Sequence, residues 1–545
     1  MCIGILAATL TARYPLMRLP VAHRSSFLTA VVVATLALAT SALAADVSVD
    51  RSTKYQTIDG FGFFGAMDSW WGNPPLVSDA WATQVLGDLG ATIWRNEYYP
   101  PADDPAVLPV PYEQDADWTK QKPVVQTLKR IADAQHVPLK IILTVWSPPS
   151  TMKCLANAAS GHAPVEGTAP QSAKGGNSLC VNSRDAFAAW LLAGLKLYKD
   201  IGIDVYGLSF QNEPYFWESY NSCFYDQANY AQTLAYLGPK IKAAYPAVKL
   251  FGAENMLEME AGASGNYFYT GEIQRVPAAG AALDIIAVHG YNDGVVPTAS
   301  SAMSALWSTM NSQFSQPMNK PLWMTETSGY LDSWSGGLVT NPDGTATTYP
   351  GAADLAYSIY AALSYGHLAG WVWWQGSRTS GFDLESLMGG AGSLSKRYYV
   401  SKQFYRFIRP GARMLKVTSA DSAVLAVAFE HTAMGSFTAV LINSSTQSKS
   451  INLTGAGVPA SLTMYTTSAT DNCATRGAVS SGSITLAPGT VNTLVSGNVY
   501  ETGGGGSGGS SPPVPLPRFA SWLLGGMLIL AGALLVRRRV RLEKT

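Results

Sequence analysis

The chain has 545 residues, of which 47% are hydrophobic and 14% charged, a composition typical of a folded globular protein and not of a disordered or collagen-like one. Its 37 basic and 37 acidic residues cancel to a net charge of zero, so the charge balance gives no reason to expect nucleic acid as a partner. The length leaves room for more than one domain.

The first 44 residues have the features of an export signal. Arg18 and Arg24 precede the apolar run 27–39, and Ala42-Leu43-Ala44 has the small-x-small pattern of a cleavage site. The residues before Met17 add nothing to a signal, which makes Met17 an alternative start. The apolar run is short for a membrane anchor. We therefore expect residues 1–44 to be a signal peptide and the protein to be exported.

Export places the remaining cysteines, Cys154, Cys180, Cys223 and Cys473, in an oxidising compartment. One or two disulfides are expected, and the spacing does not settle the pairing. We favour Cys154 with Cys180, which would close a loop rich in Gly, Ser and Ala. The chain has no CxxC motif and its six His show no HExxH or HxxxH spacing, so we expect neither a metal site nor a cofactor.

Eight strand-like apolar runs alternate with helical patterns in the central part of the chain. Among the helical patterns, Ser183 precedes a run with apolar residues at helical spacing, and another covers 225–244. This alternation predicts a (β/α)8 barrel over residues 57–408, with a doubly wound sheet as the alternative. The eight runs are Thr57–Gly62, Thr92–Asn96, Leu139–Trp146, Val205–Asn212, Lys249–Ala253, Ile285–His289, Leu322–Glu326 and Trp371–Trp374.

Short alternating strands rich in Thr, Ser and Val follow the barrel region, which predicts an all-β side domain, a β-sandwich, over residues 409–498. Residues 45–56 would add an N-terminal strand to it. The expected strands after the barrel are Ala423–Phe429, Thr438–Ile442, Ser461–Thr467 and Thr490–Val495.

The C-terminal part has a different character. Residues 499–517 are a linker of Gly, Ser and Pro, and residues 518–545 hold an uncharged apolar run, 519–536, followed by Arg537-Arg538-Arg539. Such a run is just long enough to span a bilayer with its Arg cluster inside. Together with Val514-Pro515-Leu516-Pro517, it resembles a sorting signal of the Pro-Glu-Pro type. The resemblance implies an exosortase-like processing enzyme, a plain tail anchor being the alternative. We expect a cell-surface or released monomer.

Two of the barrel runs end in a carboxylate. Glu213 follows the fourth run, in Gln211-Asn212-Glu213-Pro214, and Glu326 ends the seventh, in Trp323-Met324-Thr325-Glu326. In a barrel, groups at the carboxyl ends of strands form the site. Retaining glycoside hydrolysis needs two carboxyl groups about 5–5.5 Å apart, one acting as acid/base and one as nucleophile. Either Glu alone has a structural ion pair as its alternative reading.

The sequence resembles glycoside hydrolase family 30 over about residues 47–497. The resemblance rests on five motifs in the family's order, and it implies a retaining (β/α)8 enzyme with a side β-sandwich built from both chain ends. The motifs are Thr57-Ile58-Asp59-Gly60-Phe61-Gly62, Trp146-Ser147-Pro148-Pro149, Gln211-Asn212-Glu213-Pro214, Trp323-Met324-Thr325-Glu326, and Ser395-Lys396-Arg397-Tyr398-Tyr399 with Phe407-Ile408-Arg409-Pro410-Gly411.

The resemblance assigns the acid/base role to Glu213 and the nucleophile role to Glu326. Asn212 would contact the sugar and Arg95 would orient the nucleophile. His289 and Tyr291 would line the site, a core His and a barrel-wall Tyr being the alternatives, and Glu254 would lie behind it. Three tryptophans are candidates for a sugar-stacking floor, although rim core residues would look the same in sequence: Trp146, Trp373 and Trp374.

Xylan and glucuronoxylan are the substrates that we expect, with endo action. The motifs look closest to the glucuronoxylan-cleaving members, which hold a glucuronic-acid branch with an Arg at the position of Arg378; the Tyr that follows there is Ser380 here. An ordinary surface Arg is the alternative. The other candidates are a β-1,6-glucanase or galactanase of the same family and a non-catalytic carbohydrate-binding protein. Gly60, Gly62 and Gly65 match a dinucleotide-binding pattern, but the intervening Phe residues suit a phosphate poorly.

Overall fold

The computed structural model describes residues 44–65, 77–98, 118–157, 163–168, 174, 177–218, 220–262, 268–291, 302–340, 344–378 and 383–499. The cleavage region and apolar run of the expected signal peptide, the linker and the C-terminal apolar segment fall in 1–43 and 500–545, outside the described residues. Within the described part of the chain, no helix has both the length and the apolarity needed to cross a membrane.

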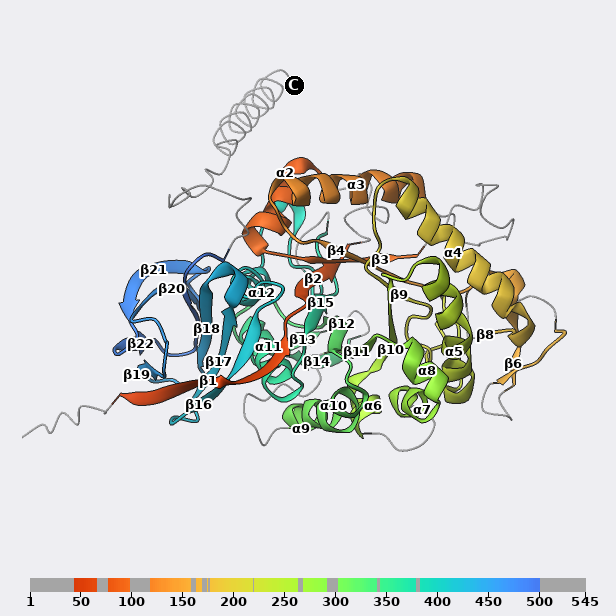
Figure 1. The fold of residues 1–545 in the computed structure, drawn as a ribbon. Helices are drawn as coiled ribbons and strands as arrows, with labels where there is room; N and C mark the ends of the chain where they lie inside the picture. Colours follow the sequence, from red (N-terminus) through yellow and green to blue (C-terminus); the bar gives the residue numbers. More distant parts are fainter. Residues whose placement is uncertain are drawn as a thin grey trace, which may run out of the picture. The chain divides into compact units, whose positions relative to one another are not determined.

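Eight parallel strands form a closed barrel, so the predicted fold class is confirmed (Figure 1). Each strand corresponds to one of the eight apolar runs. The doubly wound alternative is excluded because the last strand pairs with the first, Gly370 aligning with Gly60, which leaves no open edge. In order around the barrel the strands are β2 (Gly60–Phe64), β3 (Ile93–Glu97), β4 (Lys140–Thr144), β9 (Gly207–Ser209), β10 (Lys249–Met256), β11 (Ile285–Tyr291), β12 (Leu322–Ser328) and β15 (Gly370–Trp373).

Helices connect successive strands and lie outside the barrel (Figure 1). Their apolar faces share one core with the outer face of the strands. They are α2 (Asp79–Thr83), continued by the π-helical turn 84–89, α3 (Trp118–Ala134), α4 (Arg184–Asp200), α5 (Gln227–Ala244), α6 (Leu257–Gly262), α7 (Tyr269–Arg275), α8 (Pro277–Ala282), α9 (Ala302–Met310), α10 (Gln316–Met318), α11 (Ala352–Tyr365) and α12 (Lys396–Tyr405).

The two helices expected from the sequence begin close to their predicted positions. Helix α4 follows Ser183, but the Ser183 side chain makes no capping hydrogen bond, because a 3-10 turn at 181–183 runs directly into the helix. Helix α5 begins two residues later than predicted, after Asp226, whose carboxylate accepts from the backbone N–H of Asn229 at 2.8 Å.

The barrel interior is filled by apolar side chains from its strands and the residues beside them, including Ile142, Phe251 and Trp323. Strand β2 lies close against β3, and glycine makes this approach possible. A Cβ at Gly62 would fall 1.8 Å from the carbonyl oxygen of Ile93, and one at Gly65 would fall 1.8 Å from the Trp94 ring. The glycines that match a dinucleotide-binding pattern therefore serve strand packing.

The predicted all-β side domain is present as one continuous nine-stranded sheet. Side chains from near both ends of its strand order, such as Leu462 and Ile484, share one core, so the sheet wraps around that core. In order across the sheet the strands are β21 (Ala474–Ser480), β20 (Ser461–Thr467), β23 (Thr490–Ser496), β18 (Ser436–Asn443), β17 (Val424–His431), β16 (Arg413–Ser419), β1 (Ala45–Thr57), β19 (Lys449–Thr454) and β22 (Ile484–Leu486).

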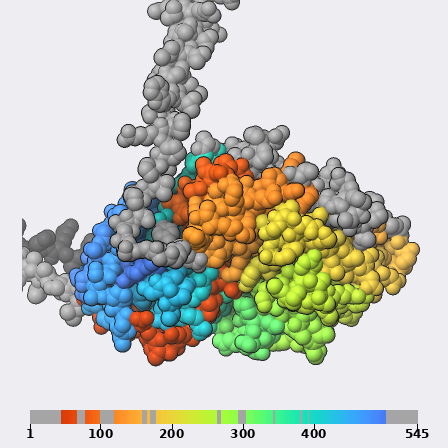
Figure 2. Space-filling model, turned by 45° about the horizontal axis from the view of Figure 1, so that its top comes forward, coloured from red at the N-terminus to blue at the C-terminus, as the bar shows by residue number. Residues whose placement is uncertain are grey.

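Strands from both ends of the described chain form this sheet. Strand β1 pairs antiparallel with β16 and parallel with β19, and Figure 2 shows its red surface beside the cyan and blue of the C-terminal strands. The barrel meets the sheet at α12 and the residues after it, where the Gln403 side chain donates to Thr467 Oγ1 and Thr438 Oγ1 donates to the Phe407 carbonyl, each at 2.8 Å.

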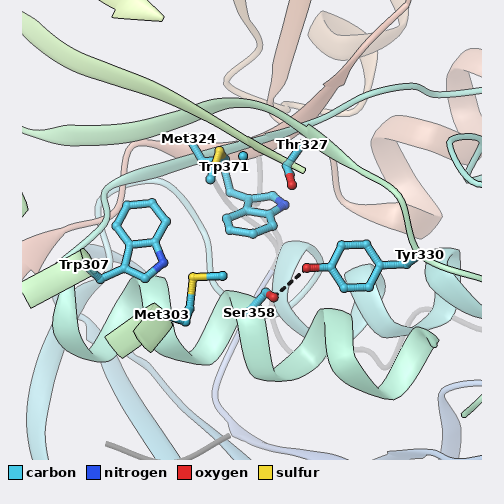
Figure 3. Close-up of a pocket in the computed structure, with 8 residues that line it drawn as sticks. Met303, Trp307, Met324, Thr327, Tyr330, Ser358 and Trp371 are labelled. Carbon is cyan, nitrogen blue, oxygen red and sulfur yellow. Dashed lines mark hydrogen bonds between the residues drawn. The ribbon is translucent and has the colours of Figure 1, made fainter. Parts of the chain in front are cut away.

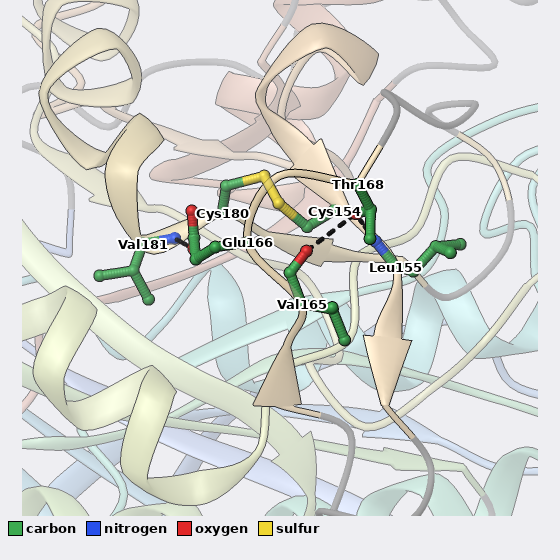
Figure 4. The surroundings of a disulfide bond; sticks show 7 residues. All are labelled: Cys154, Leu155, Val165, Glu166, Thr168, Cys180 and Val181. Carbon is green, nitrogen blue, oxygen red and sulfur yellow. Dashed lines mark hydrogen bonds between the residues drawn. A yellow bond between two sulfur atoms is a disulfide. The ribbon is translucent and has the colours of Figure 1, made fainter.

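A disulfide-closed insertion follows β4. The favoured pairing, Cys154 with Cys180, is present, with a Cα–Cα distance of 5.2 Å (Figure 4). The insertion also contains the short strand pairs β5 (Lys153–Cys154) with β8 (Ser178–Leu179) and β6 (Ala156–Asn157) with β7 (Ala163–Pro164). Across the disulfide, Glu166 accepts from the backbone N–H of Val181 at 2.5 Å. The disulfide ties the two ends of this insertion together.

Replacing both cysteines, Cys154→Ser with Cys180→Ser, should lower the unfolding free energy of the insertion by about 3 kcal/mol, because the link closes a loop of 26 residues in sequence separation. The measurement is the rate of limited proteolysis within 155–179, which should rise. Cys473→Ser, outside the insertion, is the control. An unchanged cleavage rate would show that the loop is held by its other contacts.

Candidate active site

Seven polar side chains from four strands and one loop meet at the carboxyl end of the barrel. The strands all run in the same direction, so residues at their carboxyl ends converge on one face. Arg95 is on β3, Glu254 on β10, His289 and Tyr291 on β11, and Glu326 on β12, and all belong to the described part of the chain. Asn212 and Glu213 follow β9.

Arg95 is the centre of this cluster and has no exposed surface. Its Nη1 donates to Glu326 Oε2 at 2.5 Å, and its Nη2 donates to Asn212 Oδ1 at 2.8 Å and to Glu254 Oε1 at 3.0 Å. The face of the guanidinium lies 4.9 Å from the centre of the Trp146 ring. Because a buried cation is costly without partners, these contacts hold the side chain in one orientation.

His289 lies among three carboxylates. Its Nδ1 is 2.9 Å from Glu213 Oε1 and 3.9 Å from Glu326 Oε1, and its Nε2 is 3.4 Å from Glu254 Oε1. Burial alone would lower the pKa of His289, but Glu326, Glu213 and Glu254 together raise the pKa to about 9. At neutral pH the ring is therefore a cation that donates from both nitrogens.

The two predicted catalytic carboxylates are close neighbours. An oxygen of Glu213 and an oxygen of Glu326 lie within 4.8 Å of each other. Glu326 accepts from Tyr291 Oη as well as from Arg95, and 6% of its side chain is exposed, against 11% for Glu213. Glu326 is therefore held from two sides, whereas Glu213 is the more accessible of the two.

Burial raises the pKa of Glu326 to about 7, against the lowering effects of His289 and Arg95. Glu254 behaves differently: burial would raise its pKa, but Arg95 and His289 outweigh burial, and its pKa lies below the usual value. Glu254 and Glu326 thus differ in the pH at which they ionise, and Glu254 is the carboxylate that balances the two buried cations.

Backbone strain marks two of the carboxylates. Glu213 has φ +42° and Glu254 has φ +57°, a left-handed conformation that a residue with a Cβ rarely adopts. Each such residue costs about 1–3 kcal/mol and persists only where the surrounding structure imposes it. The strain turns both side chains toward the cluster.

The cluster is poorly suited to a metal ion. Glu213, His289 and Glu326 present atoms close enough to share one. However, both nitrogens of His289 already face carboxylates, Glu213 at 2.9 Å and Glu254 at 3.4 Å. Arg95 already supplies the positive charge that Glu326 faces.

Two of the three tryptophans predicted to form a sugar-stacking floor, Trp146 and Trp373, are buried. Trp374 is partly exposed and stacks on Phe64 at 4.3 Å, with Trp146 next to it at 6.2 Å between ring centres. Trp373, by contrast, has no exposed surface, and its Nε1 donates to the Glu385 carbonyl. Alternate residues of a strand point to opposite sides, and the Trp373 ring lies in the core between the barrel strands and the helices. It therefore offers no face to a sugar.

Arg378 lies on the loop after β15, and its guanidinium is paired with two acidic side chains that follow it in sequence. Nη2 donates to Glu385 Oε2 at 3.1 Å, and Nε forms an ion pair with Asp383. The sequence pattern did not predict these partners.

Two exposed aromatic residues were missed by the sequence analysis. Trp217 is 50% exposed and Tyr220 is 45% exposed, on the segment that follows Glu213. Burial, together with the charges of Glu213, Glu218 and Glu326, raises the pKa of Tyr220. In the sequence, the feature that could have pointed to these two residues is their position, four and seven residues after Glu213.

A small cavity behind the site is not a sugar site (Figure 3). The centre of a water molecule could move within a volume of only about 10 Å³ in this cavity. The lining consists of apolar residues together with Thr327, Tyr330, Ser358 and Trp371. Tyr330 Oη and Ser358 Oγ are 2.6 Å apart across it. This volume admits at most one water molecule.

A closed (β/α)8 barrel with two neighbouring acidic side chains on its carboxyl face, beside a β-sandwich, is an arrangement found in O-glycoside hydrolases. The chain is 27% identical over 400 residues, 71% of its length and 75% of the relative's, to glucuronoxylanase XynC of Bacillus subtilis strain 168. No protein-family model matches the chain.

Solved structures share the fold. A family 30 subfamily 8 xylanase of Clostridium acetobutylicum superimposes with a TM-score of 0.61 at 21% identity, over 83% of this chain and 99% of the other. An endo-β-1,6-glucanase gives a TM-score of 0.63 at 17% identity, over 83% and 94% of the two chains. The similarity to a glucuronoxylanase and the fold shared with a family 30 xylanase support the predicted resemblance to glycoside hydrolase family 30.

Replacing Glu254 with Ala should destabilise the fold by about 3–5 kcal/mol, since Arg95 and His289 would keep buried charge without one of its partners. The measurement is the free energy of unfolding from denaturant titration. Glu258→Ala, an exposed residue four positions later, is the matched control and should change stability by no more than about 0.5 kcal/mol. Equal midpoints for the two variants would contradict a charge-balancing role for Glu254.

Proposed function

We propose that this chain hydrolyses β-glycosidic bonds of a polysaccharide by double displacement, with Glu326 as nucleophile and Glu213 as acid/base. The observation that carries the proposal is the spacing of the two carboxylates, whose nearest oxygens lie within 4.8 Å. Inverting enzymes separate the pair by about 6.5–9.5 Å to admit a water molecule, and retaining enzymes by about 5–5.5 Å.

In the first step, Glu326 attacks the anomeric carbon while Glu213 protonates the departing glycosidic oxygen, giving a covalent glycosyl-enzyme. In the second step, Glu213 takes a proton from water, which displaces Glu326. Arg95 and Tyr291 orient the nucleophile through the hydrogen bonds to its two oxygens. Asn212, held by Arg95, is available to the sugar 2-hydroxyl.

The charges of the cluster fit these roles. With Glu326 ionised, the cations Arg95 and His289 balance the anions Glu254 and Glu326, so a protonated Glu213 leaves the cluster without net charge. His289 Nδ1 donates to Glu213 Oε1, which leaves Oε2 to carry the transferable proton. A charge-neutral arrangement is favoured in a buried site, where an unpaired charge is expensive.

The substrate proposed is xylan, cleaved internally, because the curated relative at 27% identity is a glucuronoxylanase. Trp217 and Tyr220 follow the proton donor on the same segment, so they would stack on sugars of the leaving-group side. Trp374, which is partly exposed, donates its backbone N–H to the Thr327 carbonyl, next to the nucleophile in sequence, at 2.9 Å. A β-1,6-glucan is the second candidate, favoured by the fold shared with an endo-β-1,6-glucanase.

A non-catalytic carbohydrate-binding role explains less of the site. Binding needs exposed aromatic faces and hydroxyl partners, but it gives no reason for a buried Arg95–Glu326 pair beside a second carboxylate. For localisation, we propose export and attachment to the cell surface through the C-terminal apolar segment, on the basis of the sequence features at both ends.

Replacing Glu213 with Ala should lower kcat on xylan by about 10²–10⁴-fold, the usual contribution of a positioned acid. The loss should be much smaller on an aryl xyloside, because a good leaving group departs without a proton. Glu326→Ala should abolish activity on both substrates. The measurement is the release of reducing ends and of the phenol, with Glu258→Ala as control.

The anomeric form of the first product, followed by NMR, should be β in the wild-type enzyme. Full activity in Glu213→Ala and Glu326→Ala, or an α product, would contradict the proposed roles.

The pH profile tests the nucleophile separately. Glu326 must be ionised to attack, so kcat/KM should fall as the pH decreases through about 7, the pKa that burial gives this carboxyl. The Arg95 cation favours the ionised form, so Arg95→Gln should raise the pKa and move the acid limb to higher pH. Arg130→Gln, at an exposed ion pair, is the control. An acid limb that stays in place or moves down in Arg95→Gln would be inconsistent with Glu326 as the titrating nucleophile.

A further inference from the structure

Arg378 and two acidic residues of the following loop form a cluster, which we name the Arg378 cluster: Arg378, Asp383 and Glu385. Arg378 Nη2 donates to Glu385 Oε2 at 3.1 Å and Nε pairs with Asp383. The three side chains are between 26% and 36% exposed, so the cluster is accessible to a sugar at the rim of the barrel.

The two carboxylates are held in place by contacts that do not involve Arg378. Asp383 Oδ1 accepts from the backbone N–H groups of Glu385 at 2.8 Å and Ser386 at 2.6 Å. Burial would raise the pKa of Asp383, but these hydrogen bonds and Arg378 outweigh burial and lower the pKa, so Asp383 is ionised at neutral pH. Gln375 Nε2 donates to Glu385 Oε2 at 3.3 Å.

The loop that carries these carboxylates is itself anchored. Arg397, fully buried, donates twice to the Ser386 carbonyl, at 2.6 and 3.2 Å, and once to the Tyr330 carbonyl. The Gly329 N–H donates to the Leu384 carbonyl at 3.1 Å, which fixes the loop to the segment directly after β12, the strand that carries Glu326. The ion pairs therefore lie on a loop that is fixed to the barrel by its own hydrogen bonds.

Charge and tethering decide what this rim can bind. Arg378 is already paired with two carboxylates, and these like charges repel a further carboxylate that approaches it. A uronic-acid branch would also have to displace a carboxylate that is already aligned and covalently tethered, and a tethered group competes at a high effective concentration. Neutral hydroxyl groups meet no such barrier, since carboxylates accept hydrogen bonds from them.

We propose that Asp383 and Glu385 neutralise Arg378 internally, so that this rim recognises neutral sugar units and cleavage does not depend on a uronic-acid branch. The inference rests on the proposed function and specifies the substrate of the same site. It departs from the glucuronic-acid contact that the family resemblance implied for Arg378, for which an ordinary surface arginine was the alternative.

The first test measures binding and needs no turnover. Ligand-observed saturation-transfer NMR on the full-length protein would compare methyl α-D-glucuronoside with methyl α-D-glucoside. Wild type should prefer the glucuronoside by less than fivefold. The isosteric double variant Asp383→Asn with Glu385→Gln should gain at least tenfold for the glucuronoside, and adding Arg378→Ala should remove the gain. A wild-type preference above fivefold that Arg378→Ala abolishes, or no gain in the double variant, overturns the proposal.

The second test measures hydrolysis of glucuronoxylan against the same polymer with its carboxyl groups reduced to alcohols. Wild-type rates on the two should agree within fivefold, and a greater loss on the reduced polymer overturns the proposal. If neither polymer is cleaved, the proposed xylan substrate fails, and the binding measurement still decides the role of the cluster. Circular dichroism spectra that match wild type establish that the variants are folded.

Discussion

The buried guanidinium of Arg95 is the interaction around which the site is organised. It bridges Glu326, Glu254 and Asn212, which come from β12, β10 and the segment after β9, while its own strand is β3. A cation with no exposed surface is tolerated only while these partners surround it. Closure of the barrel is therefore a condition for the site, because it alone brings these strands to a common face.

The same network explains why two carboxylates keep an unfavourable backbone. Glu213 and Glu254 both have positive φ, and both face His289, whose two nitrogens reach them at 2.9 and 3.4 Å. The ionic contacts offset the strain, and the strain fixes where the carboxylates point. Preorganisation of this kind means that little reorganisation is needed when charge develops during the reaction.

Chemistry and specificity are carried by different parts of the molecule. Strands β10 and β12 and the segment after β9 hold the carboxylates. In the proposed function, the surrounding loops would meet the polymer: the disulfide-closed insertion after β4, the segment with the exposed rings of Trp217 and Tyr220, and the Arg378 cluster. Loops on a rigid scaffold vary without loss of the fold, and (β/α)8 enzymes differ in substrate for that reason. A shared fold with xylanases and with a β-1,6-glucanase agrees with this division.

Local pattern was enough to predict the eight barrel strands and the candidate pair Glu213 and Glu326, because strand periodicity and position at a strand end are properties of adjacent residues. The burial of Trp373, the partners of Arg378 and the place of His289 among three carboxylates were not accessible in that way. Each depends on which side chains meet across the closed barrel or its loops, as with Arg95 and Glu326, which touch although 231 positions apart. Only the tertiary structure decides such contacts, because burial and charge pairing depend on which residues are neighbours in the folded protein and not on which are adjacent in sequence.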